Sequence, residues 1–227
     1  MILDYSKQED LIKVQNFNHR INVIGCGALG SWLTFFLLKM GFKDVHVYDY
    51  DTIEEHNLPN QNFEESQIGC LKVDAIASIY NRYFNDEEYK RLTIHNEKVD
   101  EEIASTMKGI IFCGVDSMKA RKMIYTHSFK YGLADLWIED RIGLWGAYVY
   151  MLDKADPDFI AKAKKYEGTL YDDVEAEVSS CGISQTGLPA AVNAASVMIM
   201  EMIRWYRNEV DKWRIEYQIP EMYAVTE

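Results

Sequence analysis

Residues Ile21 to Gly30 read INVIGCGALG, and this stretch decides the fold of the chain. An apolar run ends in Gly25, Gly27 and Gly30, spaced as G-x-G-x-x-G, and an apolar helical segment follows. The pattern predicts a strand, a tight turn and a helix N-terminus that can receive a phosphate. Gly25 permits the turn, Gly27 lets a ligand approach the backbone, and Gly30 lets the helix pack on the strand. The motif therefore indicates nucleotide binding without naming a reaction.

Strands and helices alternate outward from this stretch. The hydrophobic pattern predicts strands at 20–24, 45–48, 91–94, 109–113, 136–139, 147–152 and 214–219, and helices at 5–15, 28–40, 70–84, 101–107, 117–131, 156–165 and 188–207. Such alternation is typical of an α/β fold with a Rossmann-like, doubly wound and mostly parallel sheet. We expect one domain over 1–227, with a helical arm at 1–18, a mobile acidic loop at 166–187 and a C-terminal helix at 188–207.

The composition excludes several classes of partner. The chain has 227 residues and a net charge of −12, which argues against a nucleic-acid backbone as the main ligand. The longest apolar stretch is interrupted by Asn193 and Glu201, so we expect no membrane span. The four cysteines form no C-x-x-C pair, and we expect a reducing, cytoplasmic setting.

Three polar features lie at predicted carboxyl ends of strands, where parallel sheets bind ligands. They are Gly25, Asp49 and Asp116. Asp49 follows Gly30 by 19 positions, where a carboxylate commonly accepts hydrogen bonds from ribose; the alternative is an ordinary strand-end acid. Asp51 lies two residues further on. Asp116 is placed to hold Mg²⁺ near phosphates, or to cap the helix that begins at Ser117.

Two further residues are candidates for chemistry. Lys72 lies near a predicted helix N-terminus, which disfavours a cation, so a phosphate is a natural partner; the alternative is a solvated lysine. Cys181 ends the acidic loop in Ser-Ser-Cys-Gly and is a candidate nucleophile, although nearby acids would raise its pKa. The alternative is a half-buried loop cysteine. Cys70 and Cys113 are expected in the core.

These residues belong to a larger ordered set. It comprises Tyr5-Ser6-Lys7-Gln8, Asp49-Tyr50-Asp51, Asn57-Leu58-Pro59-Asn60-Gln61, Gly69 with Lys72, Cys113 with Asp116 and Arg121, and Cys181 eight residues before Pro189. In order, spacing and residue type, the set resembles the ThiF/MoeB/HesA family of E1-like adenylyltransferases over about residues 5–207. The segment Ile138 to Gly143 and the missing cysteine pairs resemble a compact, zinc-less, stand-alone subgroup.

The resemblance implies an E1-like fold with an antiparallel C-terminal part, and a homodimer. ATP would lie on the glycine turn with its ribose on Asp49, and Mg²⁺ on Asp116. The resemblance implies that four polar residues would hold the phosphates: Asn57, Gln61, Lys72 and, from the partner subunit, Lys7. The substrate would be the C-terminal carboxylate of a ubiquitin-like or sulfur-carrier protein. Cys181 would then form a thioester or take part in sulfur transfer.

Two positions depart from the family pattern: Lys7 and Asn60 stand where the family has arginines. Asparagine at position 60 removes a cation that would reach the phosphates. A catalytically weakened nucleotide-binding relative is therefore one alternative. A nicotinamide-dependent oxidoreductase is another, because it would share the glycines and Asp49. Activation of a small-molecule or tRNA carboxylate is a third, and the acidic charge disfavours tRNA.

Overall fold

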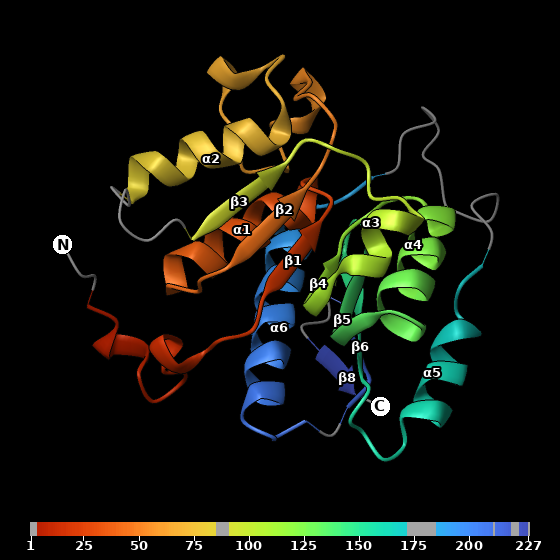
Figure 1. Ribbon diagram of the computed structural model, residues 1–227. Coiled ribbons are helices and arrows are strands. Elements are labelled where there is room, and N and C mark those ends of the chain that lie inside the picture. Colours follow the sequence, from red (N-terminus) through yellow and green to blue (C-terminus); the bar gives the residue numbers. More distant parts are fainter. Residues whose placement is uncertain (1–3, 85–90, 172–184, 211, 219–222, 227) are drawn as a thin grey trace.

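The computed structural model describes residues 4–84, 91–171, 185–210, 212–218 and 223–226. At its centre is an eight-stranded sheet with the order β3-β2-β1-β4-β5-β6-β7-β8 (Figure 1). The strands are β1 (Ile21–Ile24), β2 (Val45–Tyr48), β3 (Leu92–His95), β4 (Lys108–Cys113), β5 (Leu133–Ile142), β6 (Gly146–Asp153), β7 (Arg214–Gln218) and β8 (Tyr223–Thr226). β1 to β5 pair in parallel, and β6, β7 and β8 are antiparallel to their neighbours. The expected fold class is confirmed.

The chain reverses its direction of winding between β1 and β4. β2 and β3 follow β1 to one side, whereas β4 and β5 lie on the other. Ligands of doubly wound sheets bind beyond the carboxyl ends of the strands at this switch point. Gly25 follows β1 and Gly114 follows β4, and the Gly114 amide donates to the Ile24 carbonyl at 2.9 Å. The glycine turn therefore lies at the switch point.

Helices cover both faces of the sheet (Figure 1). One face carries α1 (Ala28–Met40), α2 (Lys72–Tyr83) and α6 (Leu188–Tyr206), and the other carries α3 (Glu101–Thr106), α4 (Met118–Ile124) and α5 (Phe159–Glu167). Each face has its own apolar core. The first centres on α1 and α6 against β1, β2, β5 and β6, and the second contains Trp137, Tyr125 and Phe129. No helix among the described residues has the length and apolarity needed to cross a bilayer.

Most predicted elements appear with small changes at their ends, and α1 and β2 have the predicted bounds. The predicted helix at 117–131 is α4 followed by a π-helical segment, Tyr125–Lys130. β8 was not predicted, because a four-residue strand at a sheet edge depends on its pairing with β7.

The predicted helical arm at 1–18 is wrong for the described residues. Two 3-10 turns, Ser6–Gln8 and Val14–Asn16, occupy the segment instead. Eleven residues are too few for a stable isolated helix, so tertiary contacts decide the conformation. The Tyr5 hydroxyl accepts from Arg91 Nη1 at 2.7 Å, and Gln8 Nε2 donates to the Met40 carbonyl at 2.5 Å. These contacts anchor the arm at the C-terminal end of α1.

Candidate nucleotide-binding site

Two glycines of the turn are required by the protein's own packing, and one is not. Gly25 has φ +92°, and a Cβ there would lie 2.8 Å from the Gly114 carbonyl oxygen. A Cβ on Gly30 would lie 1.8 Å from the Gly25 carbonyl oxygen. Gly27, in contrast, would meet nothing within 4 Å. The open space at Gly27 lies at the start of α1, where an added Cβ would contact no described atom.

The first turn of α1 presents free backbone donors beside this space. Gly27 is the N-cap, and no side chain of a described residue caps the helix. The first amide groups of a helix have no intrahelical acceptor and carry the positive end of the helix dipole. An anionic group such as a phosphate satisfies both conditions. The turn, the space and the helix start form a cradle with the donors and the room that a phosphate requires.

Asp49 lies at the carboxyl end of β2, beside the glycine turn. It is buried, and its Oδ2 accepts from the Cys26 amide at 2.6 Å while Oδ1 accepts from the Asp51 amide at 2.8 Å. A carboxylate has about four acceptor positions, so these two bonds orient the group and leave capacity for ribose hydroxyls. Burial, together with the neighbouring Asp49, raises the pKa of the Cys26 thiol well above its ordinary value. Cys26 is therefore an inert part of the turn.

Lys72 is the first residue of α2 and is buried, and it forms an ion pair with Asp51. Its Nζ lies 3.0 Å from Asp51 Oδ2, and its backbone amide donates to the Asp51 carbonyl at 2.9 Å. The ion pair offsets the unfavourable placement of a cation at a helix start. Asp51 is half-exposed, so the pair lies at the surface of the edge that carries Asp49. The structure thus brings Asp49, Asp51 and Lys72 together.

The loop between β2 and α2 packs on the first turns of α1. The Asn62 amide donates to Ser31 Oγ at 3.0 Å, and Trp32 Nε1 donates to the Asn60 carbonyl at 3.2 Å. Asn57 is buried, and its Oδ1 accepts from the Glu54 amide at 2.9 Å. Gln61 has a buried Oε1 without a hydrogen-bond partner in the described ranges. The loop therefore holds both amide side chains next to the helix that begins at the glycine turn.

Asp116 does not cap the helix that follows it. Ser117 is the N-cap, and its hydroxyl accepts from the Ala120 amide at 3.3 Å. Asp116 is exposed and makes no hydrogen bond or ion pair with a described residue. Its carboxylate is therefore available to a cation at the carboxyl end of β4.

No group of three or more metal-ligating side chains is assembled in the described part of the chain. Mg²⁺ needs no such group, because it is commonly held by one or two carboxylates, water and substrate phosphates. A single free carboxylate beside a phosphate cradle suits Mg²⁺ and does not suit zinc, which takes three or four protein ligands. The donor set fits the expected metal.

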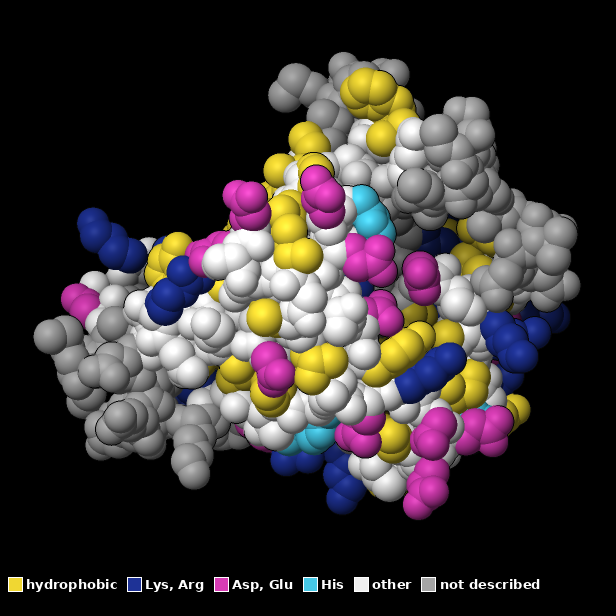
Figure 2. Space-filling view, turned by 90° about the horizontal axis from the view of Figure 1, so that it is seen from above, with side chains coloured by type: hydrophobic (Ala, Val, Ile, Leu, Met, Phe, Trp, Pro, Cys, Tyr) yellow, Lys and Arg dark blue, Asp and Glu magenta, His cyan; other side chains and the backbone are white. Residues whose placement is uncertain are grey.

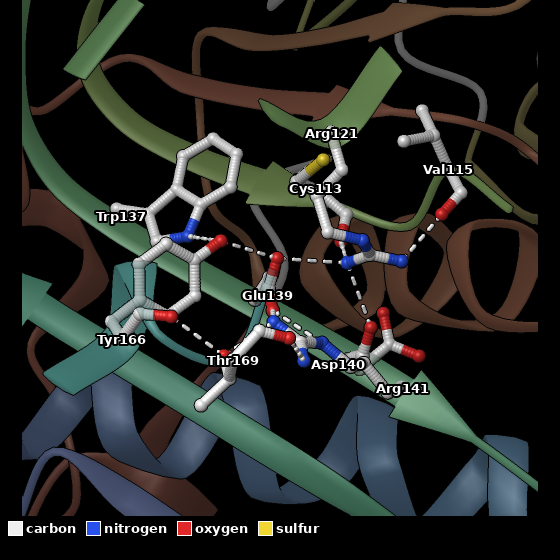
Figure 3. A network of polar contacts seen from close by, with 9 residues as sticks. All are labelled: Cys113, Val115, Arg121, Trp137, Glu139, Asp140, Arg141, Tyr166 and Thr169. Atoms are coloured by element: carbon white, nitrogen blue, oxygen red, sulfur yellow. Dashed lines mark hydrogen bonds and ion pairs between the residues drawn. The ribbon is translucent and has the colours of Figure 1, made fainter. Parts of the chain in front are cut away.

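A buried ionic network fixes the backbone on which Asp116 sits (Figure 3). Arg121 Nη1 lies 2.9 Å from Glu139 Oε2 and donates to the Asp140 carbonyl at 2.8 Å, and Nη2 donates to the Val115 carbonyl. The Tyr166 hydroxyl donates to Glu139 Oε2 at 2.7 Å. Since Val115 precedes Asp116, Arg121 orients the loop that presents this carboxylate. The sequence motif contained Arg121, but it gave no signal for the partners on β5 and α5.

Asp140 is a buried carboxyl beside this network, and no ion pair joins it to another residue in the described part of the chain. It is 4% exposed, and its Oδ1 has no hydrogen-bond partner among the residues that the structure describes. A Cβ added to Gly114 would lie 3.8 Å from that oxygen, so the carboxyl lies directly behind the switch point. Burial raises the pKa of Asp140 from 3.8 to about 7, although Arg121 favours the charged form. Arg121 and Arg141 both direct their guanidinium groups to Glu139.

Two predicted site residues lie elsewhere or outside the described residues. Lys7 is exposed and lies near Met40, at the C-terminal end of α1, whereas the glycine turn is at the N-terminal end. Cys181 lies outside the described residues. The expectation that Cys70 is a core residue is wrong: Cys70 is exposed, whereas Cys26 and Cys113 are buried. Burial raises the pKa of Cys113 to about 12.

Comparison with known proteins identifies the family of this chain. The model of the ThiF family matches residues 4–223. The chain belongs to the ThiF family. The NEDD8-activating enzyme E1 catalytic subunit of Caenorhabditis elegans is 36% identical over 111 residues, which are 47% of this chain and 25% of that subunit. The Drosophila melanogaster subunit is 35% identical over 108 residues, 46% of this chain and 23% of that protein.

This ThiF-family chain thus spans about a quarter of the length of these curated relatives. Solved structures share its fold along almost the whole chain. Escherichia coli MccB, crystallised with ATP, has a TM-score of 0.72 and 15% identity over 98% of this chain and 68% of MccB. The E. coli tRNA N6-threonylcarbamoyladenosine dehydratase TcdA has a TM-score of 0.60 and 14% identity over 87% of this chain and 91% of TcdA.

Proposed function

We propose that this ThiF-family protein uses ATP and Mg²⁺ to adenylate the C-terminal carboxylate of a ubiquitin-like or sulfur-carrier protein. The observation that carries the proposal is the open space at Gly27, at an uncapped helix start beside the buried carboxylate of Asp49. The protein's own packing does not require a glycine at position 27. A nucleotide phosphate that lies against the backbone does require one. MccB, with the same fold, is crystallised with ATP.

The residues around the cradle have distinct tasks. Asp49 accepts the ribose hydroxyls, and the amides of the first turn of α1 donate to the phosphates. Asn57, Gln61 and Lys72 hold the phosphates from the loop and the start of α2. Asp116 holds Mg²⁺, which neutralises phosphate charge when it is bound. A carboxylate oxygen of the substrate then attacks the α-phosphorus, the bond to the bridging oxygen breaks, and pyrophosphate leaves. The protein contributes mainly positioning and charge neutralisation.

The surface at the carboxyl edge of the sheet is acidic, so positive groups there are needed to bind ATP. Viewed from above, acidic side chains gather near the middle of the face, with few basic ones among them (Figure 2). The chain as a whole carries a net charge of −12. ATP is itself an anion, so Lys72, Mg²⁺ and the helix start are the attractive groups on an otherwise repulsive face. Losing any one of them weakens phosphate binding strongly.

Lys7 acts from a second copy of the chain. Within one chain it lies near the far end of α1, and a helix of 13 residues is about 20 Å long. A cation at that distance does not contact the phosphates of its own subunit. A homodimer that brings the arm of one subunit to the glycine turn of the other supplies this charge.

Cys181 is the acceptor that we propose for the activated acyl group. Its thiolate attacks the acyl carbonyl and AMP leaves, which yields a thioester; sulfur transfer is the alternative use of this thiol. In the sequence, four residues separate Cys181 from Thr186, whose carbonyl accepts from Asn60 Nδ2 in the nucleotide loop. The free thiols of Cys26, Cys70 and Cys113 suit a reducing compartment such as the cytoplasm.

Pyrophosphate exchange into ATP tests the proposal, with candidate ubiquitin-like and sulfur-carrier proteins as substrates. We expect exchange that requires a free C-terminal carboxylate and Mg²⁺, and that falls at least about 100-fold in Lys72→Ala and Asp116→Asn. Lys122→Ala and Glu102→Gln, exposed charges on α4 and α3, are matched controls that leave exchange unchanged. Tight ATP binding without exchange on any carrier would favour a catalytically weakened relative, and preferential NAD binding an oxidoreductase.

A further inference from the structure

The outer face of α1 is apolar along the whole helix. The side chains that reach the solvent recur at helical spacing, and they are Ala28, Trp32, Phe35, Phe36, Lys39 and Met40. Lys39 is the one charged residue of the helix. A surface helix normally carries polar and charged residues on this face, and a helix that is apolar on all sides is normally covered. The composition of α1 therefore indicates that something packs on its outer face.

α6 packs beside α1 and widens this apolar surface. The C-terminal ends of the two helices lie together, because the ring of Phe17 contacts both Phe42, after α1, and Tyr206, at the end of α6, with ring centroids 4.9 and 5.0 Å apart. The acid of α6, Glu201, is 4% exposed and pairs with Arg204 at 3.0 Å. We call the outer surface of residues 28–40 and 188–206 the α1–α6 face. It exposes Leu188, Val192, Asn193, Ser196, Val197 and Met200 at least in part, and no carboxylate.

The lack of exposed acids on the α1–α6 face favours a second copy of this chain as its partner. Each copy has a net charge of −12, so two copies repel one another wherever their carboxylates face each other. The helices on the other side of the sheet are charged, with Glu101 and Glu102 on α3 and Lys162 and Lys164 on α5. The α1–α6 face lets apolar surfaces meet without this repulsion.

The size of the α1–α6 face also suits a dimer. Its helices have 13 and 19 residues, and packed about 10 Å apart they outline an area of roughly 500 Å². The relief of the side chains brings this toward the ~800 Å² that each partner contributes to a standard interface.

The α1–α6 face begins at the acidic edge of the sheet. α1 starts directly after the glycine turn, beside Asp49 and Asp51. α6 starts at the same edge, because the amide of its N-cap, Gly187, donates to the carbonyl of Gly143, the residue after β5, at 3.3 Å. Acidic groups therefore flank the N-terminal end of the face.

The opposite end of the α1–α6 face is basic. Lys7 and Lys39 line an open hollow at the C-terminal end of α1, and Asp4 is the acid among its described lining residues. A two-fold axis that crosses the middle of α1 sets two copies antiparallel, so the basic end of each meets the acidic end of the other. An axis parallel to the helices would bring like ends together. Charge complementarity therefore favours the antiparallel arrangement.

We propose that the α1–α6 face binds a second copy of the chain in this antiparallel arrangement, with Phe36 of each subunit close to the two-fold axis. Phe36 lies near the middle of α1, so a perpendicular axis at that point brings it to its own symmetry mate. Lys7 of one subunit then lies toward the glycine turn of the other. The catalytic importance of this last contact rests on the proposed function.

The arm that carries Lys7 is fixed to the ends of both helices. Gln8 Nε2 donates to the Met40 carbonyl at 2.5 Å, and Arg207 Nη1 donates to the Asp10 carbonyl at 2.8 Å. Docking of the α1–α6 face therefore positions the arm without a rearrangement. An antiparallel partner displaces Lys7 by about the length of α1, ~20 Å, which is the distance that separates it from the turn of its own subunit.

Sedimentation equilibrium of the full chain tests the interface. We expect a wild-type dimer at about 10 μM, and a dissociation constant at least about tenfold higher in Met200→Glu, which adds two carboxylates to each interface. Met200 is 42% exposed, so the variant should fold, as circular dichroism would show. Ile160→Glu, the same change at an 82% exposed residue on α5, is the matched control and should dimerise as the wild type does. A monomeric wild type, or equal constants for the two variants, would overturn the inference.

A short bismaleimide tests the orientation of the two copies. In a background with Cys70→Ser and Cys181→Ser, Phe36→Cys should be cross-linked to its own symmetry mate, whereas Ile160→Cys should stay uncross-linked. A dimeric Phe36→Cys protein that is not cross-linked would overturn the antiparallel arrangement.

Mixed dimers test the contact of Lys7 with the partner's site. Lys7→Ala and Lys72→Ala, each weak in pyrophosphate exchange, should recover about a quarter of the wild-type rate when mixed, because half of the dimers are mixed and each of these holds one complete site. No recovery, with sedimentation showing mixed dimers, would overturn the placement of Lys7. If the wild type itself shows no exchange, the proposed function fails, and sedimentation and cross-linking still decide the interface.

Discussion

Replacement of Asp140 by asparagine should make the stability of the protein less dependent on pH. The carboxyl is 4% exposed, and burial raises its pKa from 3.8 to about 7. The folded protein therefore holds a proton on Asp140 that the unfolded chain releases between these two values. The stability that this proton contributes is complete below pH 3.8, and it is lost as the pH rises through about 7. Asparagine is nearly isosteric and neutral at every pH.

The size of the effect follows from linkage. Each unit of pKa difference corresponds to about 1.4 kcal/mol, so moving from pH 5 to pH 8 costs the wild type roughly 2–3 kcal/mol through this one group. The free energy of unfolding of Asp140→Asn, minus that of the wild type, should increase by this amount over the same range. Other titrating groups are common to both proteins and cancel in the difference.

Urea unfolding at pH 5, 6, 7 and 8, with linear extrapolation to water, measures the difference. Asp135→Asn is the matched control, because Asp135 is an exposed carboxylate on the same strand. Its difference from the wild type should vary by less than about 0.5 kcal/mol over this range. A flat or falling difference for Asp140→Asn would show that Asp140 is ionised in the folded protein, and would refute the assignment of a neutral buried carboxyl.

Two further predictions concern the glycine turn and the cysteines. Gly25→Ala should lower the free energy of unfolding by more than about 2 kcal/mol, because Gly25 has a positive φ and an added Cβ would press on the Gly114 carbonyl. Gly27→Ala should lower the free energy of unfolding by less than about 1 kcal/mol and still weaken ATP binding at least tenfold in calorimetry. Equal losses of stability would contradict the different roles of the two glycines. In a Cys181→Ser background, a maleimide should label the folded protein once, at Cys70, and should label the other cysteines only after denaturation. Mass spectrometry counts the labels. Rapid labelling of several cysteines in the folded protein would contradict the burial of Cys26 and Cys113.

The sequence predicted the centre of this fold because local signals there agree with the tertiary structure. α1 begins after the glycine turn and ends at Gly41, whose φ of +94° suits a glycine that terminates a helix. The buried strands read as short β-branched runs between turns. The N-terminal arm was mispredicted, because contacts of Tyr5 and Gln8 with distant residues override a weak helical pattern. Edge strand β8 was missed for the same reason.

Part of the candidate site was predictable from the sequence, because its position follows from the strand topology. Residues that follow strands, such as Asp49 and Asp116, can be assigned to one edge from topology alone. Their local environment cannot: Ser117 and not Asp116 caps α4, and Asp51 holds Lys72. The Arg121–Glu139 pair and the Asn60–Thr186 link join residues 18 and 126 positions apart, and no local pattern encodes them.

A crystal structure of the protein with ATP and Mg²⁺ tests the central claim most directly. We predict that the ribose hydroxyls lie within hydrogen-bond distance of Asp49, that the phosphates follow Gly27 and the first turn of α1, and that Mg²⁺ lies on Asp116. Lys7 of a second copy should reach the phosphates. ATP bound elsewhere, or bound on the glycine turn without contact to Asp49 and Asp116, would contradict the account.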